Sequence, residues 1–189
     1  LPFNSSNEVL NIQSNSNIND LQDFYDSSPS NHNVTIFGNT KHSFQHSTTE
    51  KFKSSINFDG SGDYLLIPNS SDFNFSSSDF TIEFWFYTTT NSVTHSLLTN
   101  ASSPWDSQST WWIGYNTLRQ LSFAPRKPDD SIVNLFANSL LSINTWYHLA
   151  FVRYNNNLLI FINGSLDITH TLDYAILNST NDLYIGVHG

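Results

Sequence analysis

The chain has 189 residues, a formal net charge of −9 and only seven Lys plus Arg residues, a balance that repels phosphate backbones and anionic lipid and so disfavours nucleic acid and membrane surfaces as partners. It contains no Cys and no Met, which excludes disulfides, Cys-ligated zinc and a thiol nucleophile. No apolar run approaches the roughly 18 residues of a membrane-spanning helix, and we expect no membrane insertion.

The first third of the chain is predicted to contain strands separated by polar turns. Residues 8–13 (EVLNIQ) form a strand within an otherwise polar stretch, and residues 56–68 (INFDGSGDYLLIP) read as a strand, a tight turn and a strand. In the turn, Gly60 and Gly62 permit positive φ, and the two flanking aspartates hydrogen-bond the local backbone. The alternative is a calcium loop. So short a turn cannot supply the roughly six to eight oxygen ligands that calcium takes, and we interpret it as structural.

The rest of the chain has the alternation that is typical of β-strands. Residues 79–87 (DFTIEFWFY) carry aromatic side chains on both faces, which predicts a central strand covered on both sides. Residues 145–154 and 158–164 flank three asparagines, which tolerate the left-handed backbone of a hairpin turn. Because no long helical period is present, the pattern predicts an all-β sandwich or jelly roll. The other predicted strands are 95–100, 111–115, 120–125, 131–137 and 182–187.

An ordered set of segments carries a resemblance to a known family; the segments are 26–39, 56–87, 144–166 and 183–189. Together they resemble the laminin-G-like, concanavalin A-like lectin superfamily, and most of all the jelly rolls of virus, phage and bacterial surface proteins and the related pentraxin branch. The resemblance covers residues 8–189, leaves residues 1–7 as an N-terminal extension, and implies two curved antiparallel sheets. Family members continue into a last strand, so we expect the domain to be C-terminally incomplete in this sequence. Either the sequence is a segment of a longer chain, or a partner chain completes the sheet.

Members of this family mostly bind glycans or proteins. Residues 100–115 are the most unusual stretch of the sequence, and their residue types suit glycan binding. They combine a polar loop with Trp and Tyr side chains. Aromatic rings stack on the C–H face of a pyranose, while Asn, Ser and Asp side chains take its hydroxyls. Trp111 and Trp112 are adjacent on a strand and must point to opposite faces, so one of them is expected in the core. The predicted glycan-binding residues are Trp105, Asp106, Trp111, Trp112, Tyr115 and Arg126.

Calcium is the one cofactor that the resemblance implies. In the family, the loop corresponding to residues 25–33 lies near a structural calcium, and a calcium-binding loop of the pentraxin branch falls near Asp106. The predicted ligands are therefore Asp26, Asn31 and Asp106. The alternative for residues 25–33 is a hydrogen-bonded turn whose corner is fixed by Pro29.

Catalysis is not predicted, although some relatives in the family are glycosidases. Retaining glycosidases of this fold place two carboxylates on alternate residues of one strand, about 5 Å apart. Glu83 lies on a predicted strand, but its alternate neighbours are Thr81 and Trp85. A degenerate glycosidase relative stays open as a weaker hypothesis, which hydrolysis abolished by Glu83→Gln would revive.

The sequence therefore predicts a non-catalytic carbohydrate-binding or adhesion module, extracellular or on a virion surface. Its partner is a glycan or a surface protein. Lone sites of this kind bind weakly, so we expect display in several copies or within a larger assembly. The alternative is a purely structural module that assembles a virion or filament through protein–protein contacts.

Overall fold

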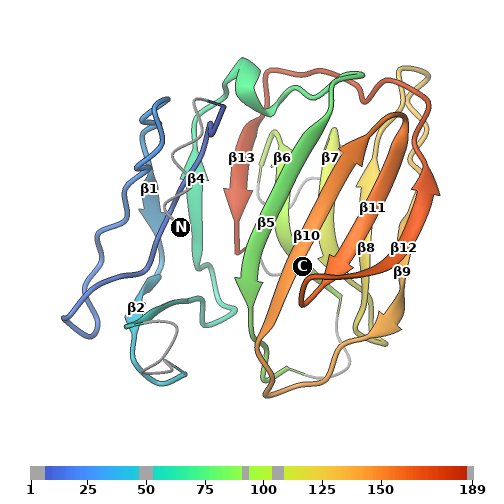
Figure 1. Cartoon of the computed structure of the whole chain (residues 1–189). Coiled ribbons are helices and arrows are strands. Elements are labelled where there is room, and N and C mark those ends of the chain that lie inside the picture. The colour runs from blue at the N-terminus through green and yellow to red at the C-terminus, as the bar shows by residue number, and fades with distance from the viewer. Residues whose placement is uncertain (1–6, 47–52, 91–93, 104–108, 187–189) are drawn as a thin grey trace.

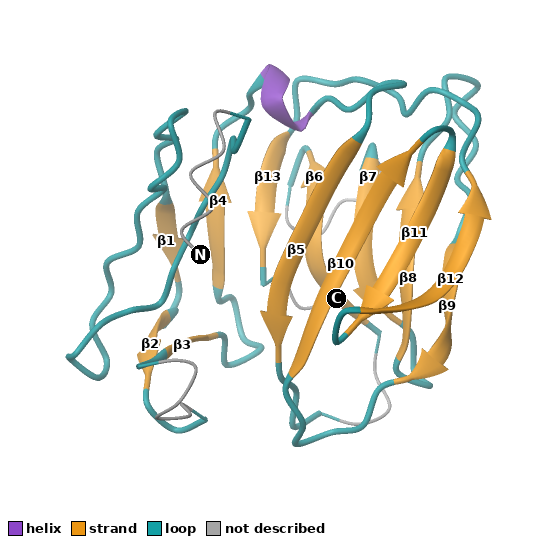
Figure 2. Ribbon diagram, viewed as in Figure 1, coloured by secondary structure: helices purple, strands orange, loops and turns teal. Residues whose placement is uncertain are grey.

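A computed structural model describes residues 7–46, 53–90, 94–103 and 109–186 as an all-β sandwich (Figures 1 and 2). The strands are β1 (Thr35–Phe37), β2 (Lys41–Ser43), β3 (Ser55–Asn57), β4 (Tyr64–Ile67), β5 (Phe80–Phe86), β6 (His95–Ala101), β7 (Trp111–Tyr115), β8 (Gln120–Pro125), β9 (Leu135–Leu140), β10 (Tyr147–Tyr154), β11 (Asn157–Ile162), β12 (Ser165–Thr171) and β13 (Asp182–Ile185). Ser71–Phe73 form a 3₁₀ turn, and no helical segment of the described part is long and apolar enough to cross a membrane.

The strands form two stacked antiparallel sheets and one separate pair. The larger sheet has seven strands in the order β1-β4-β13-β6-β7-β8-β9, and the smaller has four in the order β12-β11-β10-β5. Figure 1 shows the smaller sheet lying in front of β6 to β9, while β2 and β3 pair with each other beside β1 and β4. The predicted all-β jelly-roll sandwich is thus confirmed.

Aromatic side chains fill the space between the two sheets. Alternate residues of β5 point inward and pack against the core, as the sequence predicts. The ring centroids of Phe80 and Phe123 lie 5.7 Å apart, and those of Phe123 and Phe151 lie 6.4 Å apart. Phe123 is on β8 and Phe151 is on β10, so these rings join the two sheets through buried apolar surface.

Two sequence predictions about strands are wrong. Strand β5 is an edge strand and not a central one, because among the described strands it pairs only with β10. It is also not covered on both sides, because its outward side chains Thr81, Glu83 and Trp85 are exposed. Residues 8–13 form no strand; only Ile12 makes an isolated bridge, to Asp26. The main-chain N–H of Asn11 donates to the Asp26 carboxylate. This N–H is therefore bonded to a side chain and not to the main chain of a neighbouring strand.

The hairpin of β10 and β11 agrees with its prediction. Asn155 and Asn156 have φ values of 48° and 61°, the left-handed backbone that a tight hairpin turn requires. Strands β9 and β12, at the adjacent edges of the two sheets, are also linked: Asn138 donates from its main-chain N–H to the Asp167 carboxylate, and His170 bonds the Phe136 carbonyl oxygen at 2.7 Å. These bonds satisfy polar groups along edges that would otherwise be open.

A buried arginine fastens the loops at one end of the sandwich. Arg153 on β10 is 1% exposed, and its guanidinium donates to the carbonyl oxygens of Ser76 (2.7 Å), Leu172 (3.0 Å) and Tyr174 (3.0 Å). Burial lowers the pKa of this guanidinium. Its charge is therefore held by main-chain dipoles, and one side chain ties together segments that lie on either side of β10 in the sequence.

We expect Arg153→Met to destabilise the fold by about 3 kcal/mol, because the substitution leaves buried carbonyl oxygens without a donor. Urea denaturation followed by tryptophan fluorescence measures this change. The control is Tyr154→Phe at the neighbouring exposed residue, for which we expect a change below about 0.5 kcal/mol. Equal effects of the two substitutions would contradict the fastening role of the guanidinium.

Candidate functional site

The turn between β3 and β4 is structural and forms the wall of a surface depression. The Asp63 carboxylate, which is buried, accepts hydrogen bonds from the main-chain N–H groups of Asn39 and Asp59. Gly38 lies beside it with φ of +65°, and a Cβ at that position would be 2.2 Å from Asp63 Oδ1. Only glycine fits this close approach. The turn is thereby fixed to the segment that follows β1.

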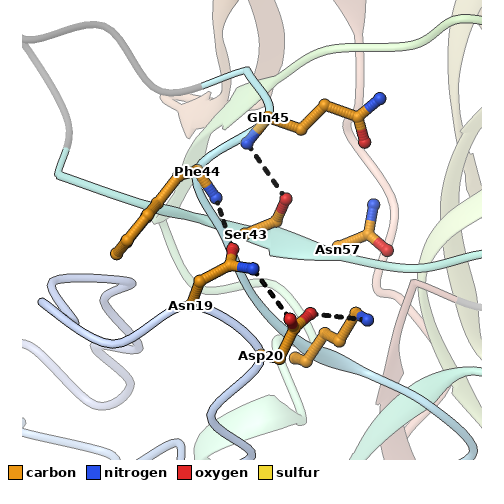
Figure 3. Close-up of a pocket in the computed structure, with 7 residues that line it drawn as sticks. Asn19, Asp20, Ser43, Phe44, Gln45 and Asn57 are labelled. Carbon is orange, nitrogen blue, oxygen red and sulfur yellow. Dashed lines mark hydrogen bonds and ion pairs between the residues drawn. The ribbon is translucent and has the colours of Figure 1, made fainter.

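The depression lies between residues 19–20 and the β2–β3 pair with the residues that follow β2, and it has a volume of about 560 Å³ (Figure 3). A second depression of about 350 Å³ adjoins it and shares Asp20, Lys41 and Asn57. We call the two together the amide groove, because carboxamide side chains dominate its lining. The lining residues are Asn19, Asp20, Gln22, Asn39, Lys41, Ser43, Phe44, Gln45, Asn57 and Asp59.

Short strand pairing explains how these side chains reach one surface. In the β2–β3 ladder Lys41 is the partner of Asn57, so both lie at the same position along the pair. Alternation on β2 directs Lys41 and Ser43 to the groove and His42 to the opposite face. The main-chain N–H of Phe44 then donates to Asn19 Oδ1 at 3.1 Å, which holds the outer wall against the end of β2.

Several lining groups have unused hydrogen-bonding capacity. The side-chain amides of Asn57 and Gln45 bond to no other described residue (Figure 3). Each such amide offers two donors and a carbonyl acceptor. Phe44 also lines the larger depression, and the residue is 39% exposed. The groove thus combines an exposed aromatic face with amides that can both donate and accept.

The charged groups of the groove are arranged around one ion pair. Lys41 Nζ lies 2.6 Å from Asp20 Oδ1, and Asp20 Oδ2 also accepts from the Asn19 amide at 2.8 Å. The hydrogen bond to Asp20 raises the pKa of Lys41, and the negative charges of Asp20, Asp63 and Asp59 raise it further. Both partners are partly exposed, so this pair orients side chains more than it stabilises the fold.

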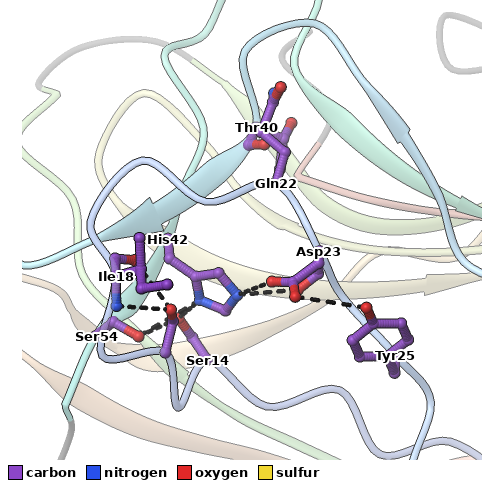
Figure 4. Close-up of polar contacts among 9 residues, drawn as sticks. Ser14, Ile18, Gln22, Asp23, Tyr25, Thr40, His42 and Ser54 are labelled. Atoms are coloured by element: carbon purple, nitrogen blue, oxygen red, sulfur yellow. Dashed lines mark hydrogen bonds and ion pairs between the residues drawn. The ribbon is translucent and has the colours of Figure 1, made fainter.

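Behind β2, a chain of hydrogen bonds fixes the segment that carries the outer wall (Figure 4). His42 Nε2 bonds the main-chain oxygen of Asp23 at 2.9 Å; that oxygen only accepts, so Nε2 carries the hydrogen. His42 Nδ1 therefore accepts from the Ser14 hydroxyl at 2.7 Å, and Ser14 Oγ bonds Ser54 Oγ at 2.8 Å. Ser14, His42 and Asp23 are the residue types of a nucleophile, a base and a carboxylate. However, His42 is only 3% exposed, and Ser14 lines neither depression. We therefore assign these residues a structural role, which is to hold in place the segment that carries the outer wall of the groove.

The structure places two predicted glycan-binding residues in the core. Trp111 is 1% exposed and its Nε1 donates to the Phe73 carbonyl oxygen at 3.0 Å. Tyr115 is also buried, and its ring lies 5.5 Å from that of Phe86. Buried rings offer no face to a ligand, so we remove both from the candidate site. The expectation that one of the adjacent tryptophans is core is confirmed.

The other predicted glycan-binding residues are scattered or lie outside the described residues. Arg126 is buried and donates to the carbonyl oxygens of Ser109 (2.9 Å) and Asp130 (3.1 Å), so it holds its own loop and not a ligand. Trp112 is half-buried on the outer face of the larger sheet, where its ring lies against Gly114. Trp105 and Asp106 lie outside the described residues.

The predicted calcium ligands at residues 25–33 do not fit a metal ion. The Asp26 carboxylate accepts from the N–H groups of Asn11 (2.9 Å), Ser28 (2.9 Å) and His32 (2.8 Å) and from the Ser28 hydroxyl (2.9 Å). These donors occupy the oxygens that a cation would need. Asn31 has φ of 47°, as in the turn proposed as the alternative. Within the described ranges no group of three or more His, Asp or Glu side chains could hold a metal ion.

Sequence reasoning missed the amide groove. Its walls come from residues 19–22, 39–45 and 57–59, and their contact depends on the β2–β3 pairing. The one signal was Phe44, a large aromatic residue within a polar stretch, which strand alternation alone does not explain.

Comparison with known proteins identifies the fold. The family described as the concanavalin A-like lectin/glucanases superfamily matches residues 59–189. The binding domain of Paraclostridial Mosquitocidal Protein 1 superposes with a TM-score of 0.75 at 17% identity, covering 96% of this chain and 44% of that one. The serotype G botulinum neurotoxin binding domain gives 0.70 at 15%, covering 94% and 42%.

A carbohydrate-bound structure is also similar. Domain 4 of an extracellular arabinanase from Geobacillus stearothermophilus, in complex with arabinotriose, has a TM-score of 0.60 at 16% identity and covers 86% of this chain and 77% of that one. No curated protein sequence matches the chain. At these identities the likeness shows the fold alone, and the chain spans less than half the length of the two toxin binding domains.

Removing the Asp26 charge should destabilise the protein in a pH-dependent way. Burial raises the pKa of the Asp26 carboxyl, but hydrogen bonds from main-chain N–H groups and the Ser28 hydroxyl lower it by more, so it lies below its ordinary value of 3.8. A carboxyl group whose pKa is lower in the folded protein than in the unfolded chain stabilises the fold at pH values above its ordinary pKa. This stabilisation is lost as the pH falls through the pKa of the folded state. We expect Asp26→Asn to cost about 2 kcal/mol at pH 7 and to lose its effect under acid conditions.

Urea denaturation of Asp26→Asn and wild type from pH 7 down to the acid limit of folding measures the difference. Asp173→Asn, at an exposed carboxylate, is the control and should follow the wild-type curve. A constant difference between Asp26→Asn and wild type at all pH values would contradict the role of the charge.

Proposed function

The chain belongs to the concanavalin A-like lectin/glucanases superfamily, and we propose that it is a non-catalytic carbohydrate-binding or adhesion module whose ligand occupies the amide groove. The observation that carries the proposal is the presence, in one lining, of unused amides at Asn57 and Gln45 and of the partly exposed Phe44. Sugar hydroxyls both donate and accept hydrogen bonds, as carboxamides do, and pyranose C–H faces stack on aromatic rings. A volume of about 560 Å³ is within the range of small-ligand sites.

The fold comparisons support a binding role over a catalytic one. Two similar structures are toxin binding domains, and a third is an arabinanase domain with bound arabinotriose. Glu83 has Thr81 and Trp85 as its neighbours on the same face of β5 and Ala150 opposite, so the described part of this strand offers no partner carboxylate for a glycosidase.

The setting that we propose is extracellular or on a virion surface, with several copies acting together. A single open groove contacts few sugar units, so useful affinity depends on avidity. Trp105, Trp112 and Asp106 remain predicted contributors to a second contact region, with calcium at Asp106. We retain residues 8–189 as one domain.

We expect Phe44→Ala and Asn57→Ala each to weaken glycan binding roughly tenfold, because each removes a stacking face or a hydrogen-bonding amide. A glycan array with and without calcium identifies a binding oligosaccharide, and titration calorimetry then compares the variants. Phe136→Ala is the matched control, since Phe136 on β9 is similarly exposed and remote from the groove. Equal losses with Phe136→Ala, or no array hit, would contradict the proposal.

The structural alternative is favoured by one observation, an apolar surface on the outer face of the smaller sheet. Trp85 is 38% exposed there, and Phe161 lies beside Ala150 and Leu166 in register. Antiparallel sheets usually present polar side chains to water. Self-association in sedimentation velocity that Trp85→Ser abolishes and Phe136→Ser does not, together with an empty glycan array, would favour assembly of copies of this chain.

A further inference from the structure

The amide groove is negatively charged. Asp20 and Asp59 line it, and the Asp63 carboxylate lies directly behind the turn that carries Asp59. Lys41 is the single basic side chain among the described residues that line the groove. Three carboxylates thus surround one ammonium group, within a chain whose formal net charge is −9.

The lysine is not available to recognise an acid group. Its ammonium is 2.6 Å from Asp20 Oδ1, and the resulting ion pair lies in the shared wall of the two depressions. An anionic ligand would have to displace Asp20 to reach this cation. It would also bring its negative charge close to the Asp59 carboxylate, and the repulsion between the two disfavours binding.

Apart from the paired Lys41 ammonium, the lining side chains that can donate a hydrogen bond to a ligand are uncharged. The Asn57 and Gln45 amides and the Asn39 side chain, which lines the smaller depression, offer donors and acceptors in equal measure. Such groups match alcohols, which also donate and accept. A carboxylate or sulfate only accepts, so it would leave the amide oxygens facing negative charge.

From this arrangement we infer that the amide groove selects uncharged glycans and rejects those that carry carboxylate or sulfate groups. The inference rests on the proposed carbohydrate-binding function and adds the chemical class of the ligand. Exclusion of acidic sugars follows from the unbalanced carboxylates, and acceptance of neutral sugars follows from the free amides and the Phe44 ring. Selection of this kind works by repulsion of the wrong ligand as well as attraction of the right one.

A matched pair of ligands tests the inference. The probe is the best neutral oligosaccharide from the array, compared with the same oligosaccharide after oxidation of one primary alcohol to a uronate. We expect the neutral form to bind about tenfold more tightly at low salt, with a smaller difference at high salt because ions screen the repulsion.

Two isosteric variants locate the cause. Asp20→Asn releases the Lys41 ammonium and should reduce the preference for the neutral form about tenfold. Asp129→Asn makes the same change in net charge at a loop outside the groove and should alter the preference less than about twofold. A third variant, Lys41→Gln, tests whether the lysine recognises acid groups.

The outcomes separate the inference from the function on which it rests. Tighter binding of the uronate, lost in Lys41→Gln, overturns the inference and leaves carbohydrate binding in place. Equal effects of Asp20→Asn and Asp129→Asn also overturn it, because the selection would then come from overall charge. If neither oligosaccharide binds, the proposed function fails, and the inference fails with it.

Discussion

The packing of Phe123 on β8 against Phe151 on β10 is the contact on which the rest of the molecule depends, because it joins the two sheets through rings that are fully buried in the core. Once these sheets bury the apolar side chains, β2 and β3 are free to carry polar ones. They lie beside β1 and β4 and away from the smaller sheet (Figure 1). The hydrophobic core therefore supplies the stability, and a peripheral strand pair supplies part of the polar lining of the amide groove, where we propose that a ligand binds.

Without disulfides, the loops of this sandwich are held by single polar side chains that each bond several main-chain groups. Asp26 gathers three N–H groups, Asp63 gathers two, and Arg153 gathers three carbonyl oxygens. Each acts as a local crosslink whose strength comes from charge-assisted hydrogen bonds. The Asp63 carboxylate holds both Asn39 and Asp59, so the residue that orders this turn also helps to shape the amide groove.

The sequence predicts what is local and fails where distant segments meet. Alternation along β5 and the asparagine turn at Asn155 were predictable, because each is determined by adjacent residues. The edge position of β5 was not, since aromatic side chains on both faces look buried until the strand order is known. The amide groove was beyond prediction for the same reason: Lys41 meets Asn57 only through the β2–β3 pairing.

The hydrogen-bonded chain behind β2 has a consequence for how the groove meets a ligand. Because Ser14, His42 and Ser54 fix the segment on one side of β2, we expect the opposite side to hold the same shape before a ligand binds. A preorganised surface loses little conformational entropy on association, so more of the contact energy is retained as affinity. In the proposed binding role, the buried imidazole would lower the entropy cost of association on the far side of its strand without touching the ligand.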